Sequence, residues 1–92
     1  MTLEDRIDAA FAGAANGHPV DVGLLSDGYA RVHTIEREIL GLVRRCDSLL
    51  DEEGSSGELW RALGRRAAFR EELTALRLRL ETVRALAARY RQ

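Results

Sequence analysis

The side chains best suited to chemistry begin with a histidine and a carboxylate, His33 and Glu36, three residues apart. On a helix this spacing places both groups on one face, where they could share a metal ion. Helical di-iron sites use the reverse order, Glu-x-x-His, and add carboxylates from other helices. The only other histidine, His18, precedes Pro19 in a loop segment. We therefore predict a solvated helix face, with no metal and no cofactor.

The chain has one cysteine, Cys46, so no disulfide can form within it. It occupies an apolar position of the repeat described below, which predicts a buried free thiol. The sequence has no Ser/His/Asp or Cys/His arrangement, no phosphate-binding glycine loop and no zinc-ligand spacing. We predict that the protein is not an enzyme.

Four arginines gather at the start of the last predicted helix, where they could bind a phosphate or an acidic partner. They are Arg61, Arg65, Arg66 and Arg70. The preceding helix ends in acidic residues that are expected to neutralise them across the turn: Asp47, Asp51, Glu52 and Glu53. Arg66 occupies an apolar position of the repeat, so we expect it either to extend towards Asp47 or Asp51 or to set the register of an oligomer.

These side chains lie along an apolar repeat that alternates spacings of three and four residues and runs twice. The first run consists of Val32, Ile35, Ile39, Leu42, Cys46 and Leu49. The second consists of Leu59, Ala62, Arg66, Phe69, Leu73, Leu76, Leu80, Val83, Ala87 and Tyr90. Such a repeat gives a helix a narrow apolar seam that another helix must cover. With a Gly/Ser break between the runs, it predicts a long antiparallel helical hairpin of the coiled-coil kind.

The whole chain, 1–92, is predicted to form a single all-α domain of three helices. The expected ranges are about 3–15, 21–52 and 58–91, with a turn at 53–57. Thr2 is a suitable N-cap for the first helix, and Gly17 suits its C-terminal end. Ser55 and Glu58 have the spacing of a capping box for the third helix.

The hairpin has two registers that satisfy the repeat, one with Cys46 opposite Ala62 and one with Cys46 opposite Phe69. Charge supports the antiparallel arrangement in both. Residues 1–30 carry five acids and one arginine, whereas 77–92 carry five arginines and one glutamate. An antiparallel pair brings these oppositely charged segments together.

The first helix is too short to be stable alone and must pack against another element. Its apolar stripe consists of Leu3, Ile7 and Phe11. We expect it to fold back over the open end of the hairpin, near Arg84, Arg89 and Arg91. It does so either on its own chain or on a second copy.

Apolar side chains outside the seam exceed what a two-helix hairpin can bury. They include Leu40, Val43, Leu50, Trp60, Leu63, Leu78 and Leu86. We therefore expect a homodimer, in which two hairpins form a four-helix bundle that also binds another protein. The candidate interaction residues are Trp60, Arg61, Arg65, Arg66 and Phe11.

Composition narrows the class of partner. The formal net charge of −1 argues against non-specific nucleic-acid binding. No apolar run approaches the roughly 20 residues of a membrane-spanning helix, so we expect a cytoplasmic protein without membrane contact. The sequence favours a non-enzymatic interaction module, such as a small adaptor, regulator or chaperone-like protein. One alternative is a small-molecule sensor with a pocket in the bundle core.

A second alternative follows from the helix–turn–helix layout and the position of Trp60 near the turn. In size and layout the chain is similar to the WXG100 family of secreted helical hairpins. That family carries Trp-x-Gly at its turn, whereas here Trp60 is followed by Arg61 and Ala62. The resemblance implies a secreted helical hairpin.

The seam assignment predicts opposite effects for two neighbouring substitutions. Ile39→Asp places a charge at a seam position and should lower the free energy of unfolding by several kcal/mol, because a buried unpaired charge is costly. Glu38→Ala, one residue away and outside the seam, should change it by less than about 0.5 kcal/mol. Thermal melts followed by circular dichroism distinguish the two, and equal melting temperatures would contradict the seam.

Overall fold

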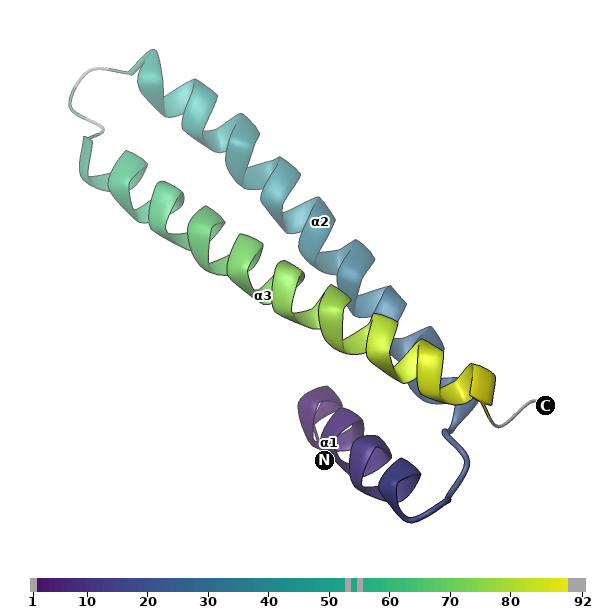
Figure 1. Cartoon of the computed structure of the whole chain (residues 1–92). Helices are drawn as coiled ribbons and strands as arrows, with labels where there is room; N and C mark the ends of the chain where they lie inside the picture. Colours follow the sequence, from purple (N-terminus) through teal and green to yellow (C-terminus); the bar gives the residue numbers. More distant parts are fainter. Residues whose placement is uncertain (1, 53, 55, 90–92) are drawn as a thin grey trace.

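The computed structural model describes residues 2–52, 54 and 56–89 of the chain. This part contains three helices and no strand: α1 (Leu3–Ala15), α2 (Val22–Leu50) and α3 (Ser56–Arg89). The all-α prediction is therefore confirmed for the described residues (Figure 1). Glu53 and Ser55 of the expected turn lie outside them, and so do Tyr90 and Arg91 of the expected last helix.

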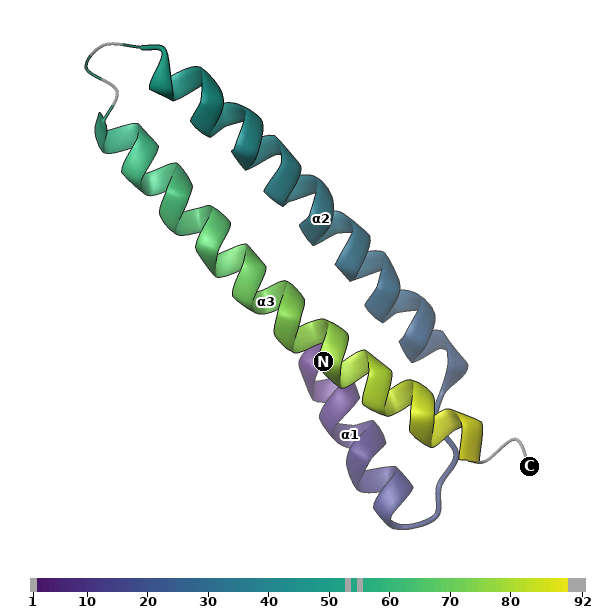
Figure 2. The same cartoon turned by 45° about the horizontal axis from the view of Figure 1, so that its top comes forward.

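α2 and α3 lie side by side and run in opposite directions, and α1 packs beside them towards the end away from the turn (Figure 1 and Figure 2). The molecule is elongated, with extents of 59 × 18 × 18 Å. α2 and α3 make most of the contacts between elements, so the long pair forms the body of the molecule.

Local side-chain bonds fix where α1 and α2 begin. The Thr2 hydroxyl accepts a hydrogen bond from the Asp5 amide at 3.1 Å, and the Asp5 carboxylate accepts one from the Thr2 amide at 3.2 Å. Gly17, just after α1, has a φ of +80°, which glycine adopts without strain. The Asp21 carboxylate accepts a hydrogen bond from the Gly23 amide at 2.9 Å and caps α2.

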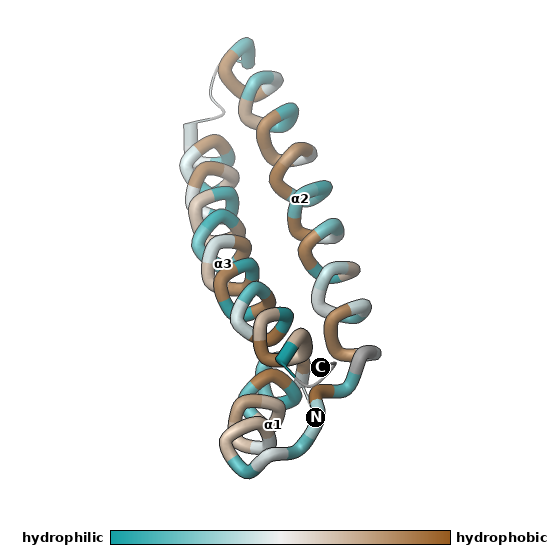
Figure 3. Tube along the Cα trace, turned by 45° about the vertical axis from the view of Figure 1, so that its right-hand side comes forward, coloured by the Kyte–Doolittle hydropathy of each residue, from teal (hydrophilic) through white to brown (hydrophobic). Residues whose placement is uncertain are grey.

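The described seam positions are all buried or half-buried, and they form two apolar clusters. The main core consists of Ile7, Leu24, Val32, Ile35, Leu76, Leu80 and Val83. A smaller cluster near the turn consists of Cys46, Leu49 and Ala62. Figure 3 shows apolar positions recurring along both long helices, as a seam requires. Cys46 is a buried free thiol, as the sequence predicts.

The structure selects one of the two registers left open by the sequence. Cys46 packs with Ala62, whereas Phe69 packs against the main core. Gly28 of α2 lies against Leu80 of α3 in the same register. The alternative, shifted by one heptad, would have placed Cys46 against Phe69.

Gly28 has no Cβ atom, and this lets Leu80 of α3 pack directly against the backbone of α2. A Cβ atom at this position would lie 2.3 Å from Cδ2 of Leu80 and 3.2 Å from its Cγ. Leu80 is fully buried, so a shift of its side chain would displace other residues of the core. A glycine inside a helix costs about 1 kcal/mol relative to alanine, and here it permits close packing of Leu80.

Two Gly→Ala substitutions in α2 should therefore have opposite effects. A Cβ atom added at Gly41 would have no neighbour within 4 Å, so Gly41→Ala should stabilise the protein by about 0.5–1 kcal/mol. Gly28→Ala should destabilise it, because Leu80 must leave its packed position. Chemical denaturation of both variants measures the difference. A gain in stability for Gly28→Ala equal to that for Gly41→Ala would contradict the packing described here.

Candidate interaction surface

The α2–α3 pair has two different sides, and α1 occupies one of them, which we call the covered side. Ion pairs between the long helices mark this side: Arg31–Glu72 at 2.7 Å and Arg45–Glu58 at 2.8 Å. The first turn of α1 lines a cleft together with Arg31 and Glu72, which places α1 on the same side. The helix thus covers the pair near its open end.

α1 is held by one buried side chain and two ion pairs. Ile7 is fully buried in the main core. Asp8 pairs with Arg79 at 2.6 Å, and Arg6 pairs with Asp27 at 2.6 Å. The sequence predicted that α1 would pack on the hairpin, but it predicted other arginines as the neighbours of α1.

The expected neighbours of α1 were Arg84, Arg89 and Arg91. In the described part of the chain, neither Arg84 nor Arg89 forms an ion pair with α1, and Arg91 lies outside it. The reason is packing: Ile7 shares a cluster with Leu80, and Arg79 is the neighbour of Leu80 in the sequence. The buried contact therefore determines which arginine meets the acids of α1.

Phe11, one of the candidate interaction residues, belongs to the same contact. It is half-buried and packs against the main core. Its ring therefore helps to hold α1 in place within the chain. Of the two sequence-based options, docking on the same chain or on a second copy, the structure has the first.

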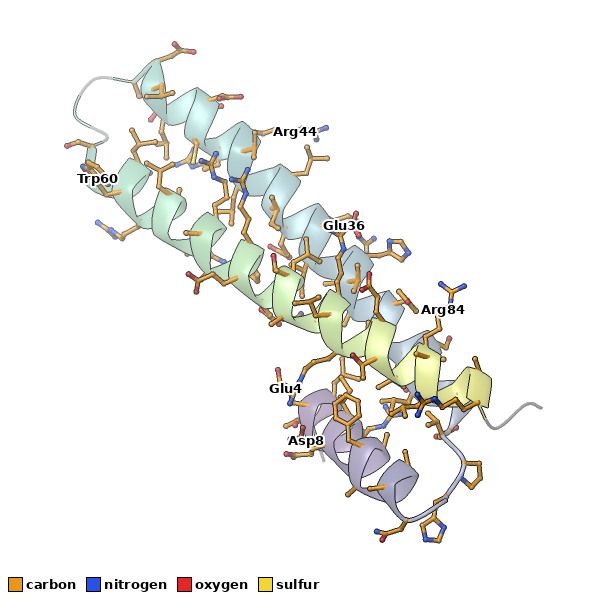
Figure 4. All side chains as sticks on the ribbon, in the orientation of Figure 1. Glu4, Asp8, Glu36, Arg44, Trp60 and Arg84 are labelled. Atoms are coloured by element: carbon orange, nitrogen blue, oxygen red, sulfur yellow. The ribbon has the colours of Figure 1, made fainter. Side chains whose placement is uncertain are left out.

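The opposite side of the pair, which we call the open side, has no helix over it in the described residues. The ion pair between Glu36 and Arg77, at 3.2 Å, lies on this side. Figure 4 shows Glu36 and Arg44 pointing away from α1, which carries Glu4 and Asp8. Residues at intervals of seven share a face of a packed helix, so the open side continues from Glu36 and Arg77 towards the turn.

Towards the turn, the open side becomes apolar. Seven and fourteen residues after Glu36 come Val43 and Leu50, and seven and fourteen before Arg77 come Arg70 and Leu63. Leu40 and Trp60 extend the same surface at helical spacing. We call this surface the turn-end face; it consists of Leu40, Val43, Leu50, Trp60 and Leu63. The exposed fractions are 51% for Leu40, 68% for Leu50 and 73% for Trp60.

A shallow groove of about 830 Å³ adjoins the turn-end face on the open side. It is lined by His33, Glu36, Arg37, Ile39, Leu40, Leu73 and Arg77. Nδ1 of His33 lies 3.8 Å from Oε1 of Glu36, and the same oxygen contacts Arg77. The described residues contain no group of three or more metal-binding side chains. The groove is thus half apolar, with a charged end.

The arginines near the turn are arranged differently from the sequence-based expectation. Within the described residues, Asp47 and Asp51 form no ion pair with Arg61, Arg65, Arg66 or Arg70. Arg61 and Arg65 line a shallow depression on the covered side with Arg45 and Glu58, and Glu58 is already paired with Arg45. Helix phase separates the other charges. Arg70 lies on the open side, and the half-buried Arg66 lies in the seam.

A second hollow, of about 380 Å³, lies between the first turn of α1 and the long helices. Its lining includes Glu4, Arg31, Glu72 and Arg79. The two arginines are already paired, with Glu72 and Asp8 respectively. This cleft is at the edge of the molecule, whereas the predicted pocket was in the core of a bundle.

The chain was compared with protein families, characterised proteins and solved structures. No family model matches the chain, and neither a characterised protein nor a solved structure does. Among the described residues, no helix is sufficiently long and apolar to cross a membrane.

The anchoring of α1 predicts a large effect for its buried residue and a small one for its exposed ion pair. Ile7→Ala should lower the free energy of unfolding by about 2–4 kcal/mol and the melting temperature by about 10 °C or more. Asp8→Ala removes the exposed pair with Arg79 and should cost less than about 1 kcal/mol. Calorimetry of both variants measures this, and equal losses would show that charge holds α1.

Proposed function

We propose that this chain is a non-enzymatic protein-interaction module of the cytoplasm. In this proposal α2 and α3 act as a coiled-coil-like helical hairpin. The hairpin pairs with a second copy in a four-helix bundle, and the remaining surface binds another protein, as in a small adaptor, regulator or chaperone-like protein. The buried free thiol of Cys46 suits a reducing compartment.

The observation that carries the proposal is the turn-end face. Single exposed leucines are common on protein surfaces and need no explanation. Here Leu40, Leu50 and Trp60 are exposed, helix phase places all three towards the open side, and Leu40 also lines the half-apolar groove. Several large apolar side chains exposed towards one side of a molecule are typical of sites that bind another protein. Trp60 is also a tryptophan, one of the residue types enriched in interface hot spots.

The use of the charged side chains supports an architectural role. Three ion pairs run between the long helices: Arg31 with Glu72, Glu36 with Arg77, and Arg45 with Glu58. Each pair joins α2 to α3. Such cross-helix pairs contribute little to stability but determine which faces meet. Of the residues that the sequence analysis considered for metal binding, Glu36 takes part in one of these orienting pairs.

The cleft beneath α1 favours one alternative, a module that binds a small molecule. Its guanidinium groups, from Arg31 and Arg79, suit a ligand with a carboxylate or phosphate group. Such a ligand would have to compete with Glu72 and Asp8 for these arginines. A rise in melting temperature with an anionic ligand, lost in Arg79→Ala, would support this alternative.

The interaction proposal predicts self-association of the purified full chain. Sedimentation velocity over a range from low to high micromolar concentration should show a shift from monomer to dimer. Burial of the exposed leucines and of Trp60 supplies the driving force, at about 25 cal/mol per Å² of apolar surface. A stable monomer at high micromolar concentration would contradict the homodimer.

A further inference from the structure

The groove on the open side has an apolar floor and a basic rim, and this combination identifies the kind of partner that fits it. The inference rests on the proposed function and goes beyond it by naming one binding surface and the chemistry of its partner. The groove is lined by two turns of α2 and by the facing part of α3, and α1 contributes nothing to it. We call it the open-side groove.

The floor of the open-side groove is apolar. Ile39 of α2 and Leu73 of α3 are seam residues that remain half-buried, and Leu40 beside them is 51% exposed. All three line the groove. Their exposed apolar surface favours an occupant that removes it from water.

The rim of the groove has an excess of positive charge. Arg37, on the α2 rim, is exposed and forms no ion pair with another described residue. Arg77, on the α3 rim, pairs with Glu36 at 3.2 Å. Glu36 is the one acid among the residues that line the groove, and His33 also lies beside it. The charge of this acid is therefore already offset, whereas that of Arg37 is not.

Arg70 extends the basic rim towards the turn. It precedes Arg77 by seven residues, so both lie on the same face of α3. Its side chain is exposed and forms no ion pair with another described residue. Two exposed acids on the open side lie beyond the groove, one at each end: Asp47 follows Leu40 by seven residues, and Glu81 follows Arg77 by four. The excess of positive charge is thus confined to the middle of the open side.

The covered side shows which kind of helix this pair of long helices accepts. α1 is amphipathic and has acids in its first turn. It buries Ile7 in the main core and pairs Asp8 with Arg79 of α3. Arg79 follows Arg77 by two residues, and the two arginines form ion pairs on opposite sides of the pair. The open-side groove therefore offers what α1 uses on the other side, an apolar seam edge beside arginines of α3.

Three other occupants fit the groove less well. Ile7 is fully buried on its own chain, so neither this α1 nor the docked α1 of a second copy has its apolar stripe free for the groove. A symmetric contact of two copies centred on the groove would bring like-charged rims together. An extended segment would need a strand edge for its backbone hydrogen bonds, and the described residues form no strand.

We propose that the open-side groove binds an acidic amphipathic helix of another protein. Apolar side chains of this helix pack on Ile39, Leu40 and Leu73. Carboxylates on its flanks pair with Arg37 and Arg70. The groove spans two turns of α2, about 10 Å, so a short helix is sufficient to cover it. The α2–α3 pair then lies between two acidic helices, α1 on the covered side and the partner on the open side.

Two synthetic peptides test the chemistry of the partner on the full chain. Both are about 15 residues long and carry leucines at spacings of three and four. One has glutamates beside the leucines, and the other has lysines at the same positions. Fluorescence anisotropy of the labelled peptides should show that the acidic peptide binds about tenfold or more tightly, and that added salt reduces this difference.

Charge reversal on each rim tests where the acidic peptide binds. Arg37→Glu and Arg70→Glu, each alone, should raise its dissociation constant about fivefold or more, because an attraction becomes a repulsion. Arg89→Glu is the matched control. Arg89 is also exposed, but it follows Leu73 by sixteen residues and lies far from the groove, so the change should stay below about twofold. Circular dichroism melts confirm that each variant remains folded.

Substitution of leucines tests the apolar floor. Leu40→Ser should weaken binding of the acidic peptide, because it removes apolar surface that the helix covers. Leu78→Ser, at a similarly exposed position on the outer face of α3, should leave binding unchanged.

The outcomes separate this inference from the proposed function. Equal binding of the two peptides, no binding of either, or equal losses in Arg37→Glu and Arg89→Glu overturn the inference. Loss of binding in Arg79→Ala with full binding in Arg37→Glu would show that the peptide replaces α1 on the covered side, which also overturns it. Sedimentation velocity of the chain without peptide reports on self-association separately. A dimer that binds neither peptide retains the proposed self-association, and a monomer that binds neither contradicts both.

Discussion

The fit between the apolar seams of α2 and α3 is the constraint on which the rest of the structure depends. Leu80 is fully buried against Gly28, and this contact sets both the separation and the level of the two helices. The ion pairs on the two sides of the seam follow from the same register. So does the position of α1, because Ile7 packs into the cluster that contains Leu80. A shift of one heptad would have altered all of these contacts together.

Hydrophobic periodicity explains why much of the fold could be predicted from the sequence. Positions such as Val32, Ile35 and Val83 recur at the helical spacing, and they are buried in the structure. The register could not be predicted, because a shift by seven residues preserves the spacing and changes only which side chains meet. Side-chain size decides it: Leu80 needs the space over Gly28, and Phe69 packs with the larger residues of the main core.

The candidate surface was predictable in composition but not in arrangement. The excess of apolar residues outside the seam, including Leu40, Leu50 and Trp60, is apparent from the repeat alone. Their gathering on one side is a consequence of helix phase and register together. The same applies to the charges. Sequence proximity suggested that Asp47 would neutralise the nearby arginines, yet residues close along the chain face different directions on antiparallel helices.

The short α1 gives the molecule two unlike ends. It has 13 residues against 34 in α3, so it can cover one side of the pair only near the open end. Two of its charged side chains are paired there, Asp8 with Arg79 on α3 and Arg6 with Asp27 on α2. Towards the turn, no described helix covers the apolar side chains of the open side. Asp47 and Arg70 form no ion pair with another described residue. Within the chain, the antiparallel pairing divides the roles between two kinds of contact: the apolar seam provides the attraction, and the cross-helix ion pairs provide the orientation.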